Sequence, residues 1–152
     1  MVDLHKLNRK IALHWLGPLD SRQTDYLCYV PVCIGQFTHG PAEFEAVLTR
    51  QTAPHHNSLA VARLNRQYLR YARLAAKDVA AGKLDRLVRL GINLAQADAL
   101  SNLSNEAINR LAFGWEGLLV QFTAEAFTQG VALRSRAAEQ HARAFVAIRL
   151  AA

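Results

Sequence analysis

The chain has 152 residues, of which 51% are hydrophobic, and it carries 18 Lys and Arg against 12 Asp and Glu, a net charge of +6. This length and apolar fraction predict one folded domain, or one domain plus an extension, and exclude a wholly disordered chain. No apolar run approaches the roughly 18 residues that a membrane span requires, and the first residues lack the apolar core of a signal peptide, so we expect a cytoplasmic protein without membrane contact. Two cysteines form no disulfide framework, which also fits the reducing cytoplasm.

The positive charge is concentrated in two segments. Residues 59–90 carry eight basic and two acidic residues, and residues 131–152 carry four basic residues and one acidic residue. Residues 1–58 are neutral, whereas residues 91–130 have a net charge of −3. Basic segments of this kind indicate an anionic partner, nucleic acid first, although charge alone names no function.

The first part of the chain predicts one clear helix and one ambiguous segment. Apolar residues recur at helical spacing over residues 4–16, and the pair Gly17-Pro18 ends that helix. In the next segment Asp20 can cap a short helix, but residues 26–34 fit a buried extended run equally well.

A domain boundary is predicted before the middle of the chain. A helix is expected over residues 41–50, because Pro suits the first helical position. Residues 51–58, which contain Pro54 and a His-His pair, have the composition of a linker. We therefore divide the chain into an N-terminal extension of unknown role, residues 1–58, and a helical domain, residues 59–152.

The clearest predicted helix covers residues 59–81 and has two distinct faces. Apolar residues at spacings of three and four define one face. Five basic residues at the same spacings lie within an arc of about 80° on another side. This cation row consists of Arg63, Arg66, Arg70, Arg73 and Lys77. Like charges at these spacings repel by some tenths of a kcal/mol, so we favour contact with phosphates or with an acidic partner over a merely solvated face.

The rest of the chain predicts further helices and a possible extended segment at residues 118–122. The expected helices cover residues 83–90, 93–100, 104–112, 124–133 and 135–150. The whole chain is therefore predicted to be all-α, with at most one short ribbon.

Short helices joined by tight turns between residues 84 and 112 fit a helix-turn-helix, but many structural helix corners share that geometry. The second helix of the pair carries only one cation, Arg110. It would be a poor recognition helix, so we expect this unit to pack against other protein.

No motif predicts catalysis. Cys28 and Cys33 lack the second pair of ligands that a zinc site needs, and we expect both to be buried thiols. Glycine-rich phosphate loops and nucleophile elbows are missing from the sequence. We therefore expect a protein that is not an enzyme and has no metal and no cofactor.

Several strings of residues resemble FlhD, the bacterial flagellar master regulator subunit. The specific part is Arg89-Leu90-Gly91-Ile92-Asn93 followed by the step Leu103-Ser104, and Leu64-Asn65-Arg66-Gln67-Tyr68-Leu69 adds to it. The resemblance covers about residues 62–150 and implies an FlhD-like all-α domain that forms a homodimer. It also implies assembly with an FlhC-like subunit, binding to double-stranded promoter DNA and activation of transcription, on flagellar genes or on conjugative elements.

The resemblance also implies site residues. DNA contact maps to the last part of the chain, at Arg134, Ser135, Arg136 and Arg143. The expected core and dimer face comprise Ile92, Leu100, Leu103, Ile108, Leu111, Val120 and Phe122. Enteric members link their subunits through a cysteine where this chain has Val120, so no such disulfide is expected here. The alternative function is a helical interaction adaptor that does not itself bind DNA.

Overall fold

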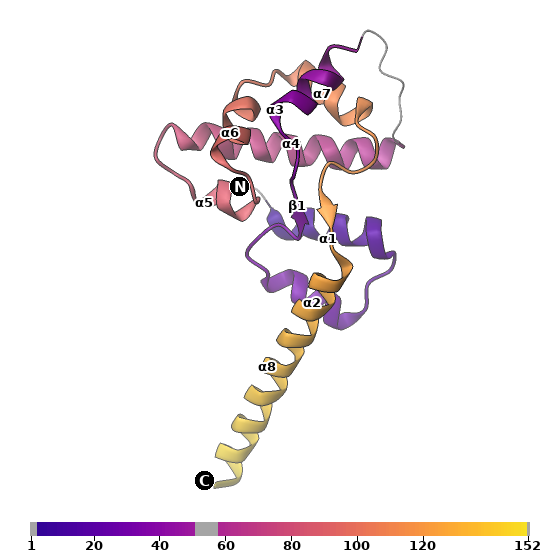
Figure 1. Ribbon diagram of the computed structural model, residues 1–152. Helices are drawn as coiled ribbons and strands as arrows, with labels where there is room; N and C mark the ends of the chain where they lie inside the picture. The colour runs from indigo at the N-terminus through magenta and orange to yellow at the C-terminus, as the bar shows by residue number, and fades with distance from the viewer. Residues whose placement is uncertain (1–2, 51–57, 152) are drawn as a thin grey trace.

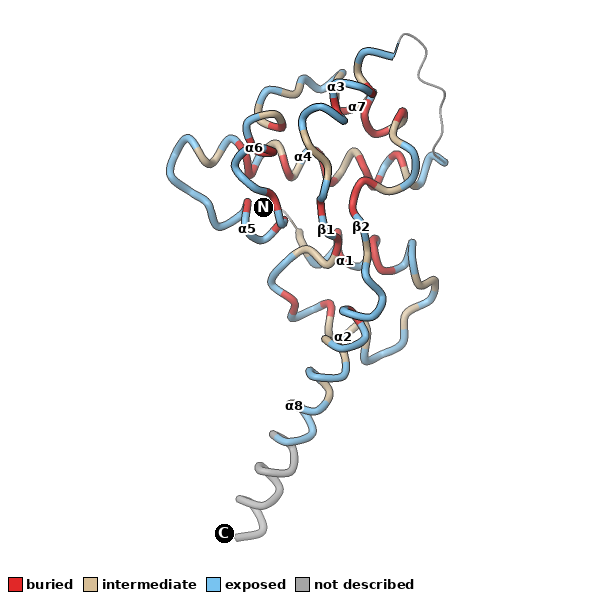
Figure 2. The backbone as a smooth tube through the Cα atoms, viewed as in Figure 1, coloured by how far each residue is buried: buried red, intermediate tan, exposed pale blue. Residues whose placement is uncertain are grey.

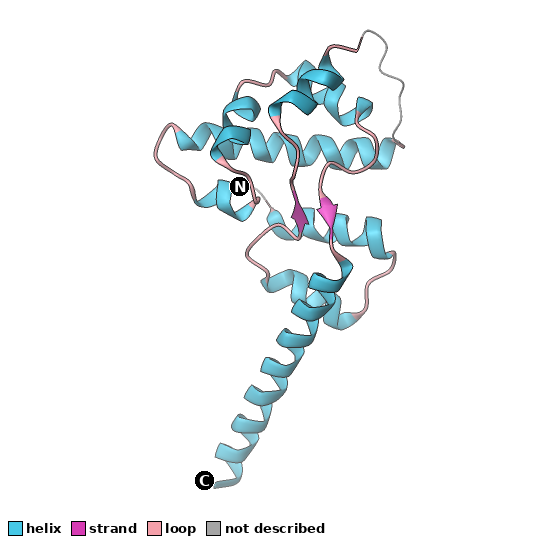
Figure 3. Ribbon diagram, in the orientation of Figure 1, coloured by secondary structure: helices cyan, strands magenta, loops and turns pink. Residues whose placement is uncertain are grey.

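The computed structural model describes the backbone of residues 3–50 and 58–151, and the side chains among them up to residue 140. Helices dominate, and the only sheet in these residues is a two-stranded antiparallel ribbon (Figure 3). The prediction of an all-α fold with at most one short ribbon is thus confirmed. None of the helices described is long and apolar enough to cross a bilayer.

Three helices and one strand make up the N-terminal part: α1 (Leu4–Leu16), α2 (Ser21–Tyr29), β1 (Gly35–Gln36) and α3 (Pro41–Leu48). The ambiguous segment is helical as far as Tyr29, because Asp20 and Gln23 form a capping box. The Asp20 carboxylate accepts the Gln23 N–H at 2.8 Å, and Gln23 Oε1 accepts the Asp20 N–H at 3.0 Å. Pro31 follows shortly after, where it cannot continue a helix.

The remaining elements follow residue 58: α4 (Leu59–Val79), α5 (Asp85–Arg89), α6 (Leu94–Ser101), α7 (Asn105–Gly114), β2 (Gln121–Phe122) and α8 (Ala124–Ala151). The turn between α5 and α6 requires a glycine, because Gly91 has a φ of +68°. Asn93 then caps α6 by accepting the Gln96 N–H at 2.9 Å.

One prediction about these elements is wrong. The two helices expected over residues 124–133 and 135–150 are a single helix, α8. Neither Pro nor a left-handed residue interrupts the backbone hydrogen bonding between them, and Ser135 sits within the helix instead of capping a new one.

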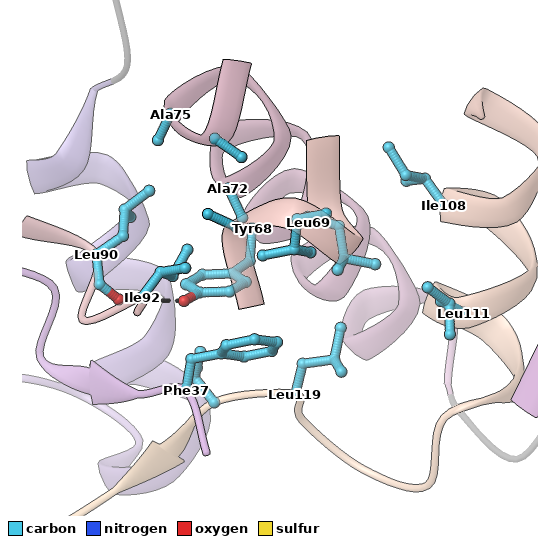
Figure 4. Packing of buried hydrophobic residues seen from close by; sticks show 14 of the residues in the cluster. Phe37, Tyr68, Leu69, Ala72, Ala75, Leu90, Ile92, Ile108, Leu111 and Leu119 are labelled. Atoms are coloured by element: carbon cyan, nitrogen blue, oxygen red, sulfur yellow. Dashed lines mark hydrogen bonds between the residues drawn. The ribbon is translucent and has the colours of Figure 1, made fainter. Parts of the chain in front are cut away.

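The long helix α4 is the centre of the fold. It runs across the middle of the molecule, with α6 and α7 on one side and α1 on the other (Figure 1). The buried face of α4 meets side chains from several other parts of the chain, among them Phe37, Leu90 and Leu119 (Figure 4). Tyr68 is buried in this core, and its hydroxyl donates to the Leu90 carbonyl at 3.1 Å.

Both predicted domains contribute to this one core. Leu7, Ile11 and Phe44 from the N-terminal part are buried in the same cluster as the α4 residues. The ribbon joins the two parts as well, because Gly35 of β1 pairs with Phe122 of β2. The linker predicted at residues 51–58 lies almost wholly outside the described residues.

The ribbon depends on a close approach between its two strands. A Cβ on Gly35 would lie 2.6 Å from Val120 Cγ2, which is shorter than van der Waals contact allows. Glycine is therefore the residue that fits at this position.

The last helix, α8, leaves the body of the molecule (Figure 1). Its first turns pack on α2 in a second, smaller cluster that buries Ala12, Leu27, Val30 and Phe127. Beyond that cluster the described part of α8 is mostly exposed (Figure 2).

Candidate nucleic-acid interface

The outward face of α4 carries four residues of the cation row that have no charged partner among the residues that the structure describes. Arg63, Arg70 and Lys77 are exposed, and Arg66 is half-buried. None of the four forms a hydrogen bond or an ion pair with any residue that the structure describes. The repulsion expected within the row is therefore not relieved by acids among these residues.

Arg73, the fifth member, has a different environment. Its Nη1 donates to the Leu103 carbonyl at 2.9 Å, and its Nη2 donates to Asn105 Oδ1 at 2.7 Å. These bonds tie α4 to the turn between α6 and α7. Both terminal nitrogens of Arg73 are thus used in hydrogen bonds within the chain. The four remaining residues form what we call the α4 cation face: Arg63, Arg66, Arg70 and Lys77.

A further cation joins this face from another helix. Lys10 of α1 donates from Nζ to Gln67 Oε1 at 2.7 Å, and Gln67 Nε2 donates to the Tyr71 hydroxyl at 3.1 Å. Gln67 lies four residues after Arg63 and three before Arg70, so it neighbours both on the helix surface. Sequence reasoning missed Lys10 because 57 residues separate it from Gln67 and no local pattern predicts that they meet.

The two basic residues of α8 whose side chains the structure describes, Arg134 and Arg136, do not form one cluster. The Arg134 guanidinium carbon lies 4.0 Å from the centroid of the Tyr29 ring, which is a cation–π contact with α2. Ser135 is half-buried and Arg136 is exposed. Residues two apart on a helix do not face each other, so Arg134 and Arg136 point to different sides. Arg143 lies in α8, but its side chain is outside the described residues.

The residues expected to form the core and dimer face are largely core. Five of them are at most 5% exposed: Ile92, Leu100, Ile108, Leu111 and Val120. The other two, Leu103 and Phe122, are partly buried against the same cluster. The five could not form a dimer face without opening the core, so that part of the expectation needs correction. In particular, the Val120 side chain packs directly against Gly35 of β1 in its own chain.

The helices α6 and α7 pack on α4 of the same chain. The single cation of α7 is also occupied, since Arg110 Nη2 donates to the Arg50 carbonyl at 3.2 Å. The helix-turn-helix-like corner therefore offers little to a DNA groove.

A cavity of about 510 Å³ lies where α1, the segment after α2, α4 and α5 meet. Its floor is apolar, and its charged groups pair with one another or with nearby side chains. Arg89 Nε is 3.1 Å from Asp85 Oδ2, and Arg86 Nη1 is 2.8 Å from Asp78 Oδ2. These ion pairs occupy the charged groups that a ligand would otherwise meet.

The shifted titratable groups are scattered. Burial raises the pKa of the Cys33 thiol to about 11, and burial also raises the pKa of the Tyr68 hydroxyl. Backbone hydrogen bonds lower the pKa of Asp3, through the Lys6 N–H, and of Glu43, through the Gly40 N–H. No three His, Cys, Asp or Glu side chains in the described residues are grouped to hold a metal ion.

One expectation about the cysteines is wrong. Cys28 is exposed on α2, whereas Cys33 is partly buried. The apolar residues of α2 that pack inward include Leu27, so its neighbour Cys28 falls on the outer side of the helix.

Comparison of the chain with protein-family models, with curated proteins and with solved structures finds no match. A function for this chain is therefore inferred from the geometry described above.

Proposed function

We propose that this chain is a DNA-binding transcriptional activator subunit, and that the α4 cation face supplies most of its contact with the phosphate backbone. The observation that carries the proposal is the set of four cations on one helix face without partners among the described residues. A phosphate backbone would relieve their mutual repulsion, and its displaced counterions would favour binding.

The expected signature is a steep dependence of affinity on salt. Each phosphate neutralised contributes about −0.9 to the slope of log K against log salt for duplex DNA. Four cations therefore account for a slope of about −3 to −4.

In this proposal α8 adds a smaller, sequence-reading contribution. Arg136 is exposed on the projecting helix and can reach a base edge, whereas Arg134 is oriented by Tyr29. Arg143 belongs to the same helix. The resemblance to FlhD adds a homodimer, an FlhC-like partner subunit and a cytoplasmic location to the proposal.

The test is fluorescence anisotropy with a labelled promoter duplex taken from the chromosomal neighbourhood of the gene, with and without the product of the adjacent gene. We expect binding that weakens by about two orders of magnitude between 50 and 200 mM salt, because a slope of about −3 to −4 acts over a fourfold change in salt concentration. The double variant Arg63→Ala/Arg70→Ala should reduce the salt slope by about 2, because two phosphate contacts are removed.

The matched control is Arg22→Ala/Lys83→Ala, which removes the same charge from exposed positions outside α4. The control should keep the wild-type slope. Equal losses in the two double variants would show that net charge matters and the α4 cation face does not, and wild-type protein that binds no duplex would refute the proposal.

The second candidate function is a protein-interaction adaptor, favoured by one observation. Leu74 lies among the cations of α4 and is 50% exposed, and a mixed apolar and basic surface also fits an acidic protein partner. Loss of partner co-purification in Leu74→Ser, together with a wild-type chain that binds no duplex, would support the adaptor.

A further inference from the structure

We infer that Lys10 of α1 and the α4 cation face form one flat surface that docks on the backbone of duplex DNA without entering a groove. This inference rests on the proposed DNA-binding function and deepens it. It gives Lys10, a residue of the N-terminal part, a direct role in binding. It also assigns most of the affinity for DNA to this surface and the reading of the base sequence to α8.

The α4 cation face has packed neighbours on both sides of the helix. Gln67 marks the flank of α4 that meets α1, and Arg73 marks the flank that meets the α6–α7 turn. These two positions lie about 120° apart around the helix axis, and the cations lie between them. A helix with neighbours on both flanks is wider than the roughly 12 Å major groove, which admits a single helix. The α4 cation face therefore meets DNA from outside the groove.

The α4 cation face extends over most of the length of the helix. Arg63 and Lys77 are 14 residues apart, which corresponds to about 21 Å along the helix. Duplex DNA rises about 3.4 Å per base pair, so this row spans roughly six base pairs along the duplex axis. A flat row of this length is suited to several phosphates and not to one base step.

Lys10 adds a cation from α1 to this face. Its Nζ is held at 2.7 Å from Gln67 Oε1, beside Arg63 and Arg70, and the acceptor neutralises none of its charge. The same bonds occupy Gln67, the amide on this part of α4 that could otherwise read adenine. What the surface offers is positive charge, which all DNA sequences attract equally.

The experiment uses the full chain and 30-base-pair duplexes of unrelated sequence, followed by anisotropy at several salt concentrations. Lys10→Ala is compared with Lys6→Ala, a matched control on the same helix whose ammonium is instead 3.1 Å from Asp3. We expect Lys10→Ala to reduce the salt slope by about 1 on every duplex and Lys6→Ala to leave it unchanged. Both side chains are exposed, so neither substitution removes a buried contact.

A second arm tests whether a groove is entered. Duplexes in which cytosines carry a glucosylated 5-hydroxymethyl group have a filled major groove and an unchanged backbone. We expect the wild-type chain to bind these duplexes within about twofold of the unmodified ones, since phosphate contacts carry no base information. A tenfold loss of affinity on the glucosylated duplex would overturn the inference, as would equal slopes for Lys10→Ala and Lys6→Ala.

The outcomes also separate this inference from the proposed function. If wild-type protein binds no duplex at 50 mM salt, both fail. If it binds, and only the Lys10 or groove arm contradicts expectation, the protein binds DNA but does not use this surface in the way described.

Discussion

Helices α4 and α8 both carry several basic residues, but among the residues described only those of α4 lie on one face of the helix. The inner face of α4 is buried in the main core, so its cations are sorted onto the outward face. The described part of α8 packs on α2 near its start and is otherwise mostly exposed (Figure 2). Its cations Arg134 and Arg136, two residues apart, point to different sides of the helix. Basic residues that are close in sequence form one positively charged surface only when packing of the helix determines which of its faces is exposed.

The same difference is consistent with the roles proposed for the two helices, phosphate contact for α4 and base reading for α8. A helix fixed on three sides holds its cations in a constant pattern, which suits contact with a regular backbone. A helix attached near one end can adjust its position, which suits a contact that must find a particular base edge or a partner protein. The predictions below test how far this contrast extends.

The largest expected effect is a difference in stability between two leucine-to-alanine substitutions, one on each helix. Leu69 of α4 is fully buried, and Leu69→Ala should destabilise the fold by about 2–5 kcal/mol, because a cavity remains in the core. Leu133 of α8 is 65% exposed, and Leu133→Ala should change stability by less than about 0.5 kcal/mol. Urea denaturation of both variants measures the contrast, and comparable losses would show that α8 is packed as firmly as α4.

A second prediction concerns the buried amide of α4. Asn65 donates to the Gly117 carbonyl at 2.9 Å and accepts the Leu119 N–H at 2.8 Å, so it fixes the segment that leads into β2. Asn65→Ala leaves the buried Leu119 N–H without this partner and also removes the part-buried bond to the Gly117 carbonyl, so it should cost about 1–3 kcal/mol. The measurement is again the free energy of unfolding in urea. Asn109→Ala is the control, because the Asn109 Oδ1 is buried without a hydrogen bond in the described structure, and a larger loss there would contradict this account.

A third prediction tests how α8 is attached to the body. A Cβ on Gly130 would lie 2.6 Å from Tyr26 Cζ on α2, so Gly130→Ala should push the two helices apart at a cost of about 1–3 kcal/mol, partly offset by better helix propensity. In a Tyr26→Ala background the clash is gone, and the same substitution should stabilise the protein by up to about 1 kcal/mol. Thermal unfolding of the four proteins of this cycle gives both values, and a loss that persists without Tyr26 would point to a different contact.

Much of α4 could be predicted from sequence because its signals are local. Apolar and basic residues alternate at helical spacing within residues 59–81, and the caps at Asn93 and Ser104 lie next to the helices they start. Patterns of this kind need no knowledge of the rest of the chain. The boundaries of α4, α6 and α7 were therefore predictable to within one or two residues.

Which residues belong to the candidate interface could not be predicted from the sequence, because this depends on contacts between segments that are distant along the chain. Nothing near Arg73 indicates that Leu103 and Asn105 accept its hydrogen bonds 30 and 32 residues later. In the same way, the pairing of β1 with β2 brings Gly35 to Val120 and buries a position that the resemblance to FlhD places between subunits. Periodicity predicts which face of a helix is polar, but only the fold decides which polar side chains remain free.

The smallest expected effect tests whether Arg134 is oriented by α2. The Arg134 guanidinium lies over the Tyr29 ring, and Tyr29 is 63% exposed, so the contact is worth about 0.5–1 kcal/mol. Tyr29→Leu should lose that amount, whereas Tyr29→Phe keeps the ring and should lose almost none. In an Arg134→Ala background the two substitutions should become equivalent, because no cation remains to distinguish them. Equal unfolding free energies for Tyr29→Leu and Tyr29→Phe in the otherwise wild-type chain would show that the contact between Arg134 and Tyr29 does not stabilise the protein. In that case α8 would be attached by its apolar contacts alone.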